Sequence, residues 1–99
     1  MFAVIWEYEV RAGAEAEFAA LYGRDGAWVA LFRRHDGYVD TELWRDADTP
    51  DRFVTIDRWT SATAYAAFIT TAQPDYAQID ARGDALTLTE RCLGRYTAA

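Results

Sequence analysis

The chain has 99 residues, with 16 acidic against 10 basic side chains and a formal net charge of −6. This length leaves room for one hydrophobic core, so we expect a single domain over residues 1–99. The basic residues are all arginines and are scattered along the chain, which excludes the basic stripe that nucleic-acid binding requires.

Residues 2–10, FAVIWEYEV, are rich in β-branched and aromatic side chains and predict a strand. Glu7 and Glu9 interrupt this apolar run, and no basic segment precedes it. We therefore expect neither a secretion signal nor a membrane anchor, and a cytoplasmic protein with no membrane partner. Cys92 is the only cysteine, which excludes a disulfide framework and a cysteine zinc site.

Two short helices are predicted next, over residues 14–22 and 26–34. Each carries apolar residues at positions i, i+3 and i+4, the spacing of one helix face. Gly23 offers a stop for the first helix and Gly37 for the second. We assign Trp28, on the second apolar stripe, to the core.

Residues 38–46 and 52–59 predict two strands that form a hairpin. Pro50 lies in the loop between them, where it excludes both a helix and a central strand. We assign Trp59, at the end of the second strand, to the core beneath Tyr65.

Ser61 is an N-cap signal for a further helix. The apolar stripe expected to face the sheet consists of Tyr65, Phe68, Ile69 and Ala72. Pro74 interrupts that helix, residues 75–82 continue as a short helix, and residues 85–96 predict the last strand.

The predicted order β, α, β, β, α, β, with both helical segments divided, is typical of a ferredoxin-like α+β fold. Such a fold has a four-stranded antiparallel sheet with helices on one face. Its other face is left bare while carrying apolar residues from every strand. A second sheet from another copy of the chain would cover that face, so we expect a homodimer formed through the sheet faces.

Three segments together resemble an antibiotic biosynthesis monooxygenase domain, and the resemblance extends over nearly the whole chain. They are WEYEV with the following turn and EAEF, GAWVALFRRHDGYVDTEL, and RFVTIDRWTSATAYAAF. The family belongs to the dimeric α/β-barrel superfamily, so the resemblance implies that fold and a dimer. Similar proteins include cofactor-free oxygenases acting on aromatic polyketides and haem-degrading enzymes.

In those oxygenases, Asn, Trp, Tyr and Arg side chains hold a phenolic substrate between the sheet and the helices. The enolate or phenolate of the substrate then reduces oxygen directly, without a cofactor. This chain departs from that set because it contains no Asn. The haem-degrading branch uses a His near the end of the second long helix, and AFITTAQPDYAQIDAR contains none, so haem degradation is disfavoured.

Three residues are the candidates for catalysis. His35 is the only histidine and could take a phenolic proton; alternatively, it is a cation at a helix end, where the helix dipole favours it. Arg58 must pair with an acid or an anionic ligand if its face is covered, either as a phenolate stabiliser or in an intersubunit salt bridge. Tyr8, or alternatively Tyr65, could donate to the developing charge.

The candidate substrate-binding residues are aromatic. Trp6 shares a strand face with Tyr8, and Trp44 shares one with acidic side chains. A wet aromatic face predicts a pocket wall, and a dimer interface explains both tryptophans nearly as well. Tyr65 and Phe68 would either line the same pocket or fill the core.

Asp40, Glu42 and Asp57 form an acidic group on the predicted hairpin. Alternation places Asp40 and Glu42 on one face, and Asp57 lies on the partner strand. A divalent-metal site is one interpretation. A solvated strand end whose charges deter edge aggregation is the other, and we predict no metal ligands.

The sequence thus favours a cofactor-independent monooxygenase that oxidises a small aromatic, phenolic or quinol-like molecule in a pocket between the sheet and the helices. The alternative is a non-catalytic dimeric binding module for a hydrophobic metabolite. An oxygenase requires polar groups that converge on one substrate atom, whereas a binding module needs only an apolar cavity.

Overall fold

The computed structural model describes residues 1–99 and contains four strands and four helices. In chain order they are β1 (Phe2–Val10), α1 (Glu15–Tyr22), α2 (Ala27–Phe32), β2 (Tyr38–Arg45), β3 (Arg52–Trp59), α3 (Ala62–Thr71), α4 (Asp75–Asp84) and β4 (Thr87–Thr97). None of the helices is long and apolar enough to cross a membrane.

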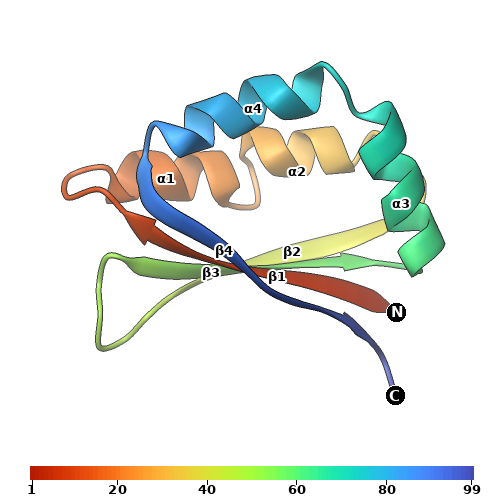
Figure 1. Cartoon of the computed structure of the whole chain (residues 1–99), viewed down its shortest axis with the longest axis horizontal. Coiled ribbons are helices and arrows are strands. Elements are labelled where there is room, and N and C mark those ends of the chain that lie inside the picture. Colours follow the sequence, from red (N-terminus) through yellow and green to blue (C-terminus); the bar gives the residue numbers. More distant parts are fainter.

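The four strands form one antiparallel sheet in the order β2-β3-β1-β4. All the helices lie over the same face of this sheet, and the opposite face has no helix on it (Figure 1). This arrangement confirms the predicted ferredoxin-like α+β fold with a β2–β3 hairpin.

Local signals in the sequence explain how α3 is positioned. The Ser61 hydroxyl accepts a hydrogen bond from the backbone N–H of Ala64 at 3.1 Å, which confirms the predicted cap. Gly37 adopts a positive φ of 91°, and a Cβ there would lie 2.5 Å from the Ala64 side chain. Only glycine therefore allows the turn before β2 to pack against the first turn of α3.

An aromatic core fills the space between the helices and the sheet. Trp59 has no exposed surface, and its ring lies 5.8 Å from that of Tyr65, as predicted. Trp28 is also buried, as predicted. Ile69, in contrast, is 40% exposed. The α3 stripe that faces the core contains Phe68 but not the residue after it, which is rotated toward solvent.

The uncovered face of the sheet carries apolar side chains, as expected from the alternation of the strands. Ile5 of β1 lies opposite Ile56 of β3, and Trp44 of β2 lies opposite Val54. Trp44 is 59% exposed. Surface tryptophans next to other apolar side chains are typical of protein interfaces.

We predict that Gly83→Ala destabilises the protein by about 1–3 kcal/mol, although alanine favours a helix by about 1 kcal/mol over glycine. Gly83 is buried in α4, and a Cβ there would overlap the hydroxyl of Tyr22, which is itself buried. Urea denaturation measures the effect. In a Tyr22→Phe background, which lacks the overlapping oxygen, the loss should shrink. Equal stabilisation by alanine in both backgrounds would contradict the predicted contact.

Candidate functional site

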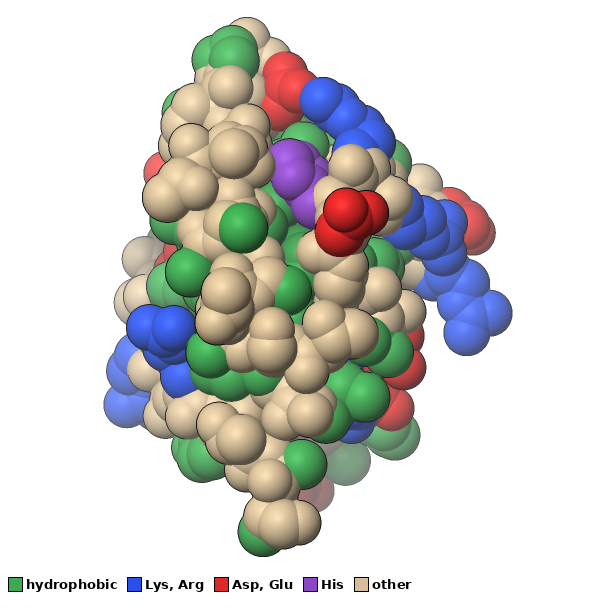
Figure 2. Space-filling view, turned by 90° about the vertical axis from the view of Figure 1, so that its right-hand side faces the viewer, with side chains coloured by type: hydrophobic (Ala, Val, Ile, Leu, Met, Phe, Trp, Pro, Cys, Tyr) green, Lys and Arg blue, Asp and Glu red, His purple; other side chains and the backbone are tan.

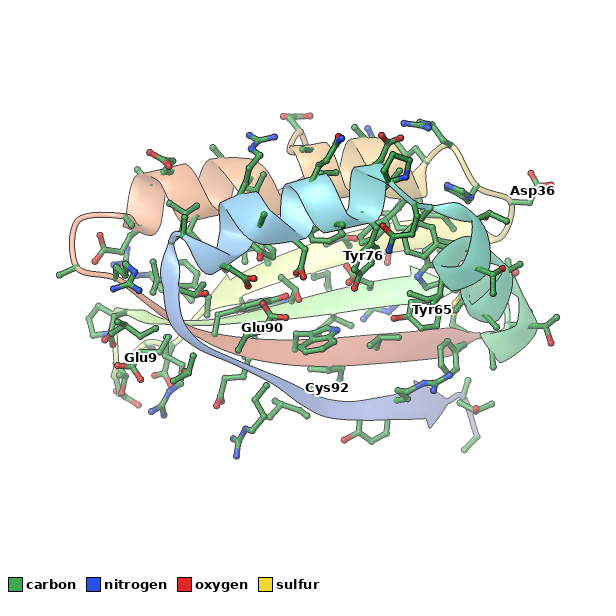
Figure 3. All side chains as sticks on the ribbon, turned by 45° about the horizontal axis from the view of Figure 1, so that its top comes forward. Glu9, Asp36, Tyr65, Tyr76, Glu90 and Cys92 are labelled. Atoms are coloured by element: carbon green, nitrogen blue, oxygen red, sulfur yellow. The ribbon has the colours of Figure 1, made fainter.

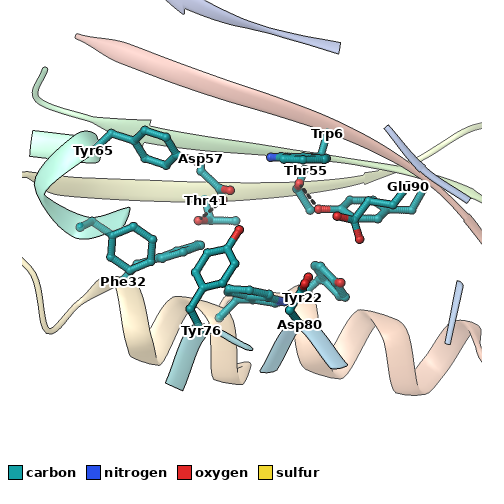
Figure 4. A pocket seen from close by; sticks show the side chains of 13 residues that line it. Trp6, Tyr22, Phe32, Thr41, Thr55, Asp57, Tyr65, Tyr76, Asp80 and Glu90 are labelled. Carbon is teal, nitrogen blue, oxygen red and sulfur yellow. Dashed lines mark hydrogen bonds between the residues drawn. The ribbon is translucent and has the colours of Figure 1, made fainter. Parts of the chain in front are cut away.

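A narrow pocket lies between the sheet and the helices, and every strand and every helix contributes to its wall (Figure 4). Its volume is about 40 Å³. Aromatic side chains dominate the lining, with a few hydroxyl and carboxyl groups among them. The lining residues are Trp6, Tyr8, Tyr22, Trp28, Phe32, Thr41, Thr55, Asp57, Tyr65, Phe68, Tyr76, Asp80 and Glu90.

The register of the sheet determines which strand residues reach this pocket. Directly opposed residues in antiparallel strands share a face. Trp6 lies opposite Thr55, and Thr41 lies opposite Asp57, so all four point toward the helices. The Tyr8 hydroxyl lies 3.0 Å from Thr55 Oγ1, a buried hydrogen bond on the pocket floor.

Asp57 is the acidic group on the sheet side of the pocket. Its Oδ1 accepts a hydrogen bond of 2.7 Å from Thr41 Oγ1, which in turn accepts one of 2.8 Å from the Tyr38 hydroxyl. Burial raises the pKa of Asp57 to about 6, and repulsion from Asp40 adds to this while the Thr41 hydrogen bond opposes it. The carboxyl group therefore changes its charge just below neutral pH.

The sequence reasoning considered Asp57 only as a metal ligand and missed its place in the pocket. The signal was present, because alternation along β3 places Asp57 on the same face as Phe53 and Trp59, both fully buried. An acid on an otherwise buried strand face is typical of a functional site.

Several pocket side chains are neutral hydrogen-bond donors. Burial is the main cause that raises the pKa of Tyr8, Tyr65 and Tyr76 above the usual tyrosine value, that of Tyr76 to about 12. Their hydroxyl groups therefore remain protonated at physiological pH. Tyr22 Oη and Trp28 Nε1, like Trp59 Nε1 outside the pocket, are buried and make no well-formed hydrogen bond. The Trp28 N–H nevertheless lies close enough to Tyr22 to oppose the rise that burial causes in the pKa of Tyr22.

Acidic side chains lie at the α4–β4 side of the pocket. Asp80, Asp84 and Glu90 bring carboxylate oxygens within 4.8 Å of one another, the spacing that would allow them to share a metal ion. Loss of part of the surrounding water, followed by repulsion within the group, raises the pKa of Asp80 and of Glu90, although Glu90 remains exposed at the pocket edge. Glu90, Tyr65 and Tyr76 all extend into the space between helices and sheet (Figure 3). This acidic rim disfavours anionic substrates.

Four of the predicted site residues meet in this pocket. Trp6, Tyr8, Tyr65 and Phe68 all line it, from β1 and α3.

His35, a predicted candidate for the base, is not among the residues that line the pocket. It lies in the turn after α2, where its ring contacts Phe68 at 4.9 Å and its Nδ1 is 3.4 Å from Thr71 Oγ1. The single histidine is visible at the molecular surface (Figure 2). Its contact with Phe68 places it next to a residue that lines the pocket, but not in the lining itself.

Arg58 and Trp44 also lie outside the pocket, on the uncovered face of the sheet. The register explains this, because Asp57 faces the helices and the next residue must face the other way. The Arg58 guanidinium pairs with Asp40 at 3.2 Å and Glu42 at 2.9 Å. Both partners come from its own chain. The guanidinium charge is therefore already paired and does not require a substrate anion.

The same register separates the acidic group considered for a metal. Asp57 lies opposite Thr41, and Thr41 is the residue of β2 between Asp40 and Glu42. Asp57 therefore points toward the helices, while the other two point away from them with Arg58.

Comparisons with known proteins agree with this architecture. The family model described as "Antibiotic biosynthesis monooxygenase" matches residues 1–78. SnoaB from Streptomyces nogalater, described as a cofactor-independent oxygenase, is 30% identical, with a TM-score of 0.81 over 99% of this chain and 92% of that chain. Comparison with curated proteins finds no match.

Two more distant structures share the fold. A candidate antibiotic biosynthesis monooxygenase from Deinococcus radiodurans is 18% identical, with a TM-score of 0.75 over 100% of this chain and 93% of that chain. A conserved protein from Methanosarcina mazei Go1 is 12% identical, with a TM-score of 0.74 over 99% and 92%. The family model matches most of the length of the chain, and the 30% identity to SnoaB agrees with that match. The chain therefore belongs to the antibiotic biosynthesis monooxygenase family.

Proposed function

We propose that this protein is a cofactor-independent monooxygenase that oxidises a small aromatic molecule, phenolic or quinol-like, in the pocket between the sheet and the helices. One observation carries the proposal. Two buried donors that make no well-formed hydrogen bond, Tyr22 Oη and Trp28 Nε1, lie near each other in the wall of an aromatic pocket. The 30% identity to a cofactor-independent oxygenase supports the same reaction class.

The pocket walls suit a flat aromatic substrate. Trp6 and Phe68 line the pocket from opposite layers of the fold, and contact between aromatic rings adds to the hydrophobic gain on binding. The unfilled volume, about 40 Å³, is smaller than such a substrate. Binding therefore requires lining side chains to move, and the exposed Glu90 is the least constrained of them.

The donors suit a substrate that becomes an anion. Removal of an O–H or activated C–H proton leaves an electron pair on the substrate, which reduces molecular oxygen. Oxygen adds to the substrate carbon as a peroxide anion, which takes up a proton to become a hydroperoxide. The hydroperoxide then loses water together with the remaining hydrogen of that carbon, so one oxygen atom stays in the product as a carbonyl and the other leaves as water. Neutral donors such as Trp28 and Tyr76 stabilise the anion in a site with little water.

The alternative function is a non-catalytic binding module for a hydrophobic metabolite. The positions of His35 and Arg58 favour it, because two of the three catalytic candidates from the sequence lie outside the pocket. A binding module would retain an aromatic molecule without consuming oxygen.

We predict that metal-stripped protein consumes oxygen with at least one member of a panel of anthrones, quinols and phenols. Trp6→Leu should lower kcat/KM at least about tenfold, the equivalent of about 1.4 kcal/mol, because it removes a ring from the pocket wall. Oxygen-electrode rates with product mass analysis measure both effects.

The matched control is Trp44→Leu, which changes a tryptophan on the other face of the same sheet and should leave the rate within about twofold. Tight binding of a panel member with no oxygen uptake would establish the binding module instead. An equal loss in both variants would show that the pocket wall is not what limits the reaction.

We also propose a homodimer in which the uncovered sheet faces of two copies pack together. Ile5, Ile56 and Val54 would form its centre, with the exposed Trp44 and Tyr96 nearby. A sheet face of this kind gains free energy when another sheet covers it. Arg58, paired with both Asp40 and Glu42, would enter the interface as a group with one net negative charge.

We predict that Ile56→Asp converts the dimer into a monomer, because it places a charge at the centre of the proposed interface. Light scattering coupled to gel filtration gives the mass, and circular dichroism verifies the fold. Ile69→Asp is the matched control, since this isoleucine is exposed on α3 away from the sheet face, and it should remain dimeric. A wild-type monomer at micromolar concentration would refute the proposed interface.

A further inference from the structure

We propose that Asp57 is the general base of this pocket, and that Thr41 and Tyr38 form the hydrogen-bonded chain through which its proton leaves. The inference rests on the proposed function for the identity of the substrate, but the proton transfer itself can be measured without oxygen. It gives the pocket a catalytic residue in place of His35.

The position of Asp57 fits this role. It extends from β3 toward the helices, and its Oδ1 is occupied by the Thr41 hydroxyl. No side chain donates to Oδ2, and no arginine pairs with Asp57, in contrast to the acids on the other face of the sheet. One oxygen is thus held in place while the other remains available to a proton from the pocket.

No positively charged group near Asp57 compensates its negative charge. The titratable side chains nearest to it come from the neighbouring strands and from the helices above, and they are Tyr8, Tyr22, Tyr38, Asp40, Tyr65, Tyr76, Asp80 and Glu90. None of these is a cation, and Asp40 repels it from the other face of the sheet. The Tyr76 hydroxyl points toward Asp57 and Thr41 (Figure 4), so a donor and the base meet at one place in the pocket.

The base strength is suited to work near neutral pH. Because burial raises the pKa of Asp57 to about 6, the group is largely ionised at pH 7 and still a stronger base than an ordinary aspartate. Catalytic bases perform best when their pKa is near the working pH. An aspartate with an ordinary pKa would be a base about 100-fold weaker toward a phenolic proton.

The hydrogen-bonded chain provides an exit for the proton. At rest, Tyr38 donates to Thr41 at 2.8 Å and Thr41 donates to Asp57 at 2.7 Å. After Oδ2 takes the substrate proton, a half-turn of the carboxyl group brings that proton to Thr41 Oγ1, and the Thr41 and Tyr38 hydroxyls rotate so that each donates outward. Thr41 then receives the carboxyl proton and passes its own proton to Tyr38, and Tyr38 releases its own proton to solvent. Each hydroxyl gains one proton and loses one, and Tyr38 is partly exposed on the edge strand β2.

Asp57→Asn tests the base directly, because asparagine preserves the size of the side chain and an acceptor for Thr41. Wild-type kcat/KM should rise with pH to a plateau with an apparent pKa near 6. Asp57→Asn should lose at least about 100-fold at pH 7. Its residual rate should then rise toward pH 10 as the substrate ionises by itself.

The same variant should have a melting temperature at pH 7 several degrees above that of the wild type, because it removes a buried charge. A loss of activity in a more stable protein excludes misfolding as its cause. Asp36→Asn, an exposed acid that points away from the fold (Figure 3), should retain wild-type activity.

Thr41→Val and Tyr38→Phe test the chain. Removal of the Thr41 hydroxyl should move the kinetic pKa upward, because its hydrogen bond lowers the pKa of Asp57. Tyr38→Phe should lower kcat several-fold with little change in KM, since it affects release of the proton and not substrate binding. An unchanged kinetic pKa in Thr41→Val would refute the coupling.

Anthrone under nitrogen separates the base from the oxygenase. Wild-type protein should convert bound anthrone to its coloured enolate, whereas Asp57→Asn should bind anthrone in the keto form, detected by quenching of tryptophan fluorescence. Enolate formation without oxygen uptake when air is admitted would support the base and overturn the oxygenase.

Two other outcomes overturn the assignment of the base. Equal enolate formation by wild type and Asp57→Asn, at equal binding, would show that another group takes the proton. A wild-type protein that neither binds nor ionises anthrone would overturn the base together with the proposed substrate class.

Discussion

The pairing of Thr41 with Asp57 across the β2–β3 hairpin is the constraint on which the rest of the structure depends. Side chains alternate along a strand, so this single register sends Thr41, Thr55 and Asp57 toward the helices. It sends Asp40, Glu42 and Arg58 to the opposite face, where the arginine pairs with both acids. A slip by one residue would place the ion pairs in the aromatic core and the buried acid in solvent.

Retention of an unpaired acid in the core costs stability. The pKa of Asp57 rises from 3.8 to about 6, which corresponds to about 3 kcal/mol at neutral pH. The folded state keeps its proton to a higher pH than the unfolded chain does, so this cost develops as pH rises from about 4 to about 6 and is absent at lower pH. The aromatic rings around the pocket offset it through their burial.

The sequence predicted the fold because each element carries its own signal. Ser61 caps α3, and both strands of the hairpin are rich in the β-branched and aromatic residues that favour strands. The site was harder to predict, because the sequence does not fix the hairpin register. Trp6 and Trp44 had similar patterns, and only the register shows that one lines the pocket while the other lies on the uncovered face.

The proposals place chemistry on one face of the sheet and assembly on the other. The helix-covered face holds Asp57 and the neutral donors, whereas the uncovered face holds apolar side chains and the ion pairs of Arg58. A second sheet packed on the uncovered face would hold β3 from behind, at Ile56 and Arg58, the residues on either side of Asp57 in the chain. Catalytic groups act best when the elements that carry them are rigid. Dimerisation in the proposed geometry would therefore stiffen the strand that carries the base without contributing any atom to the pocket.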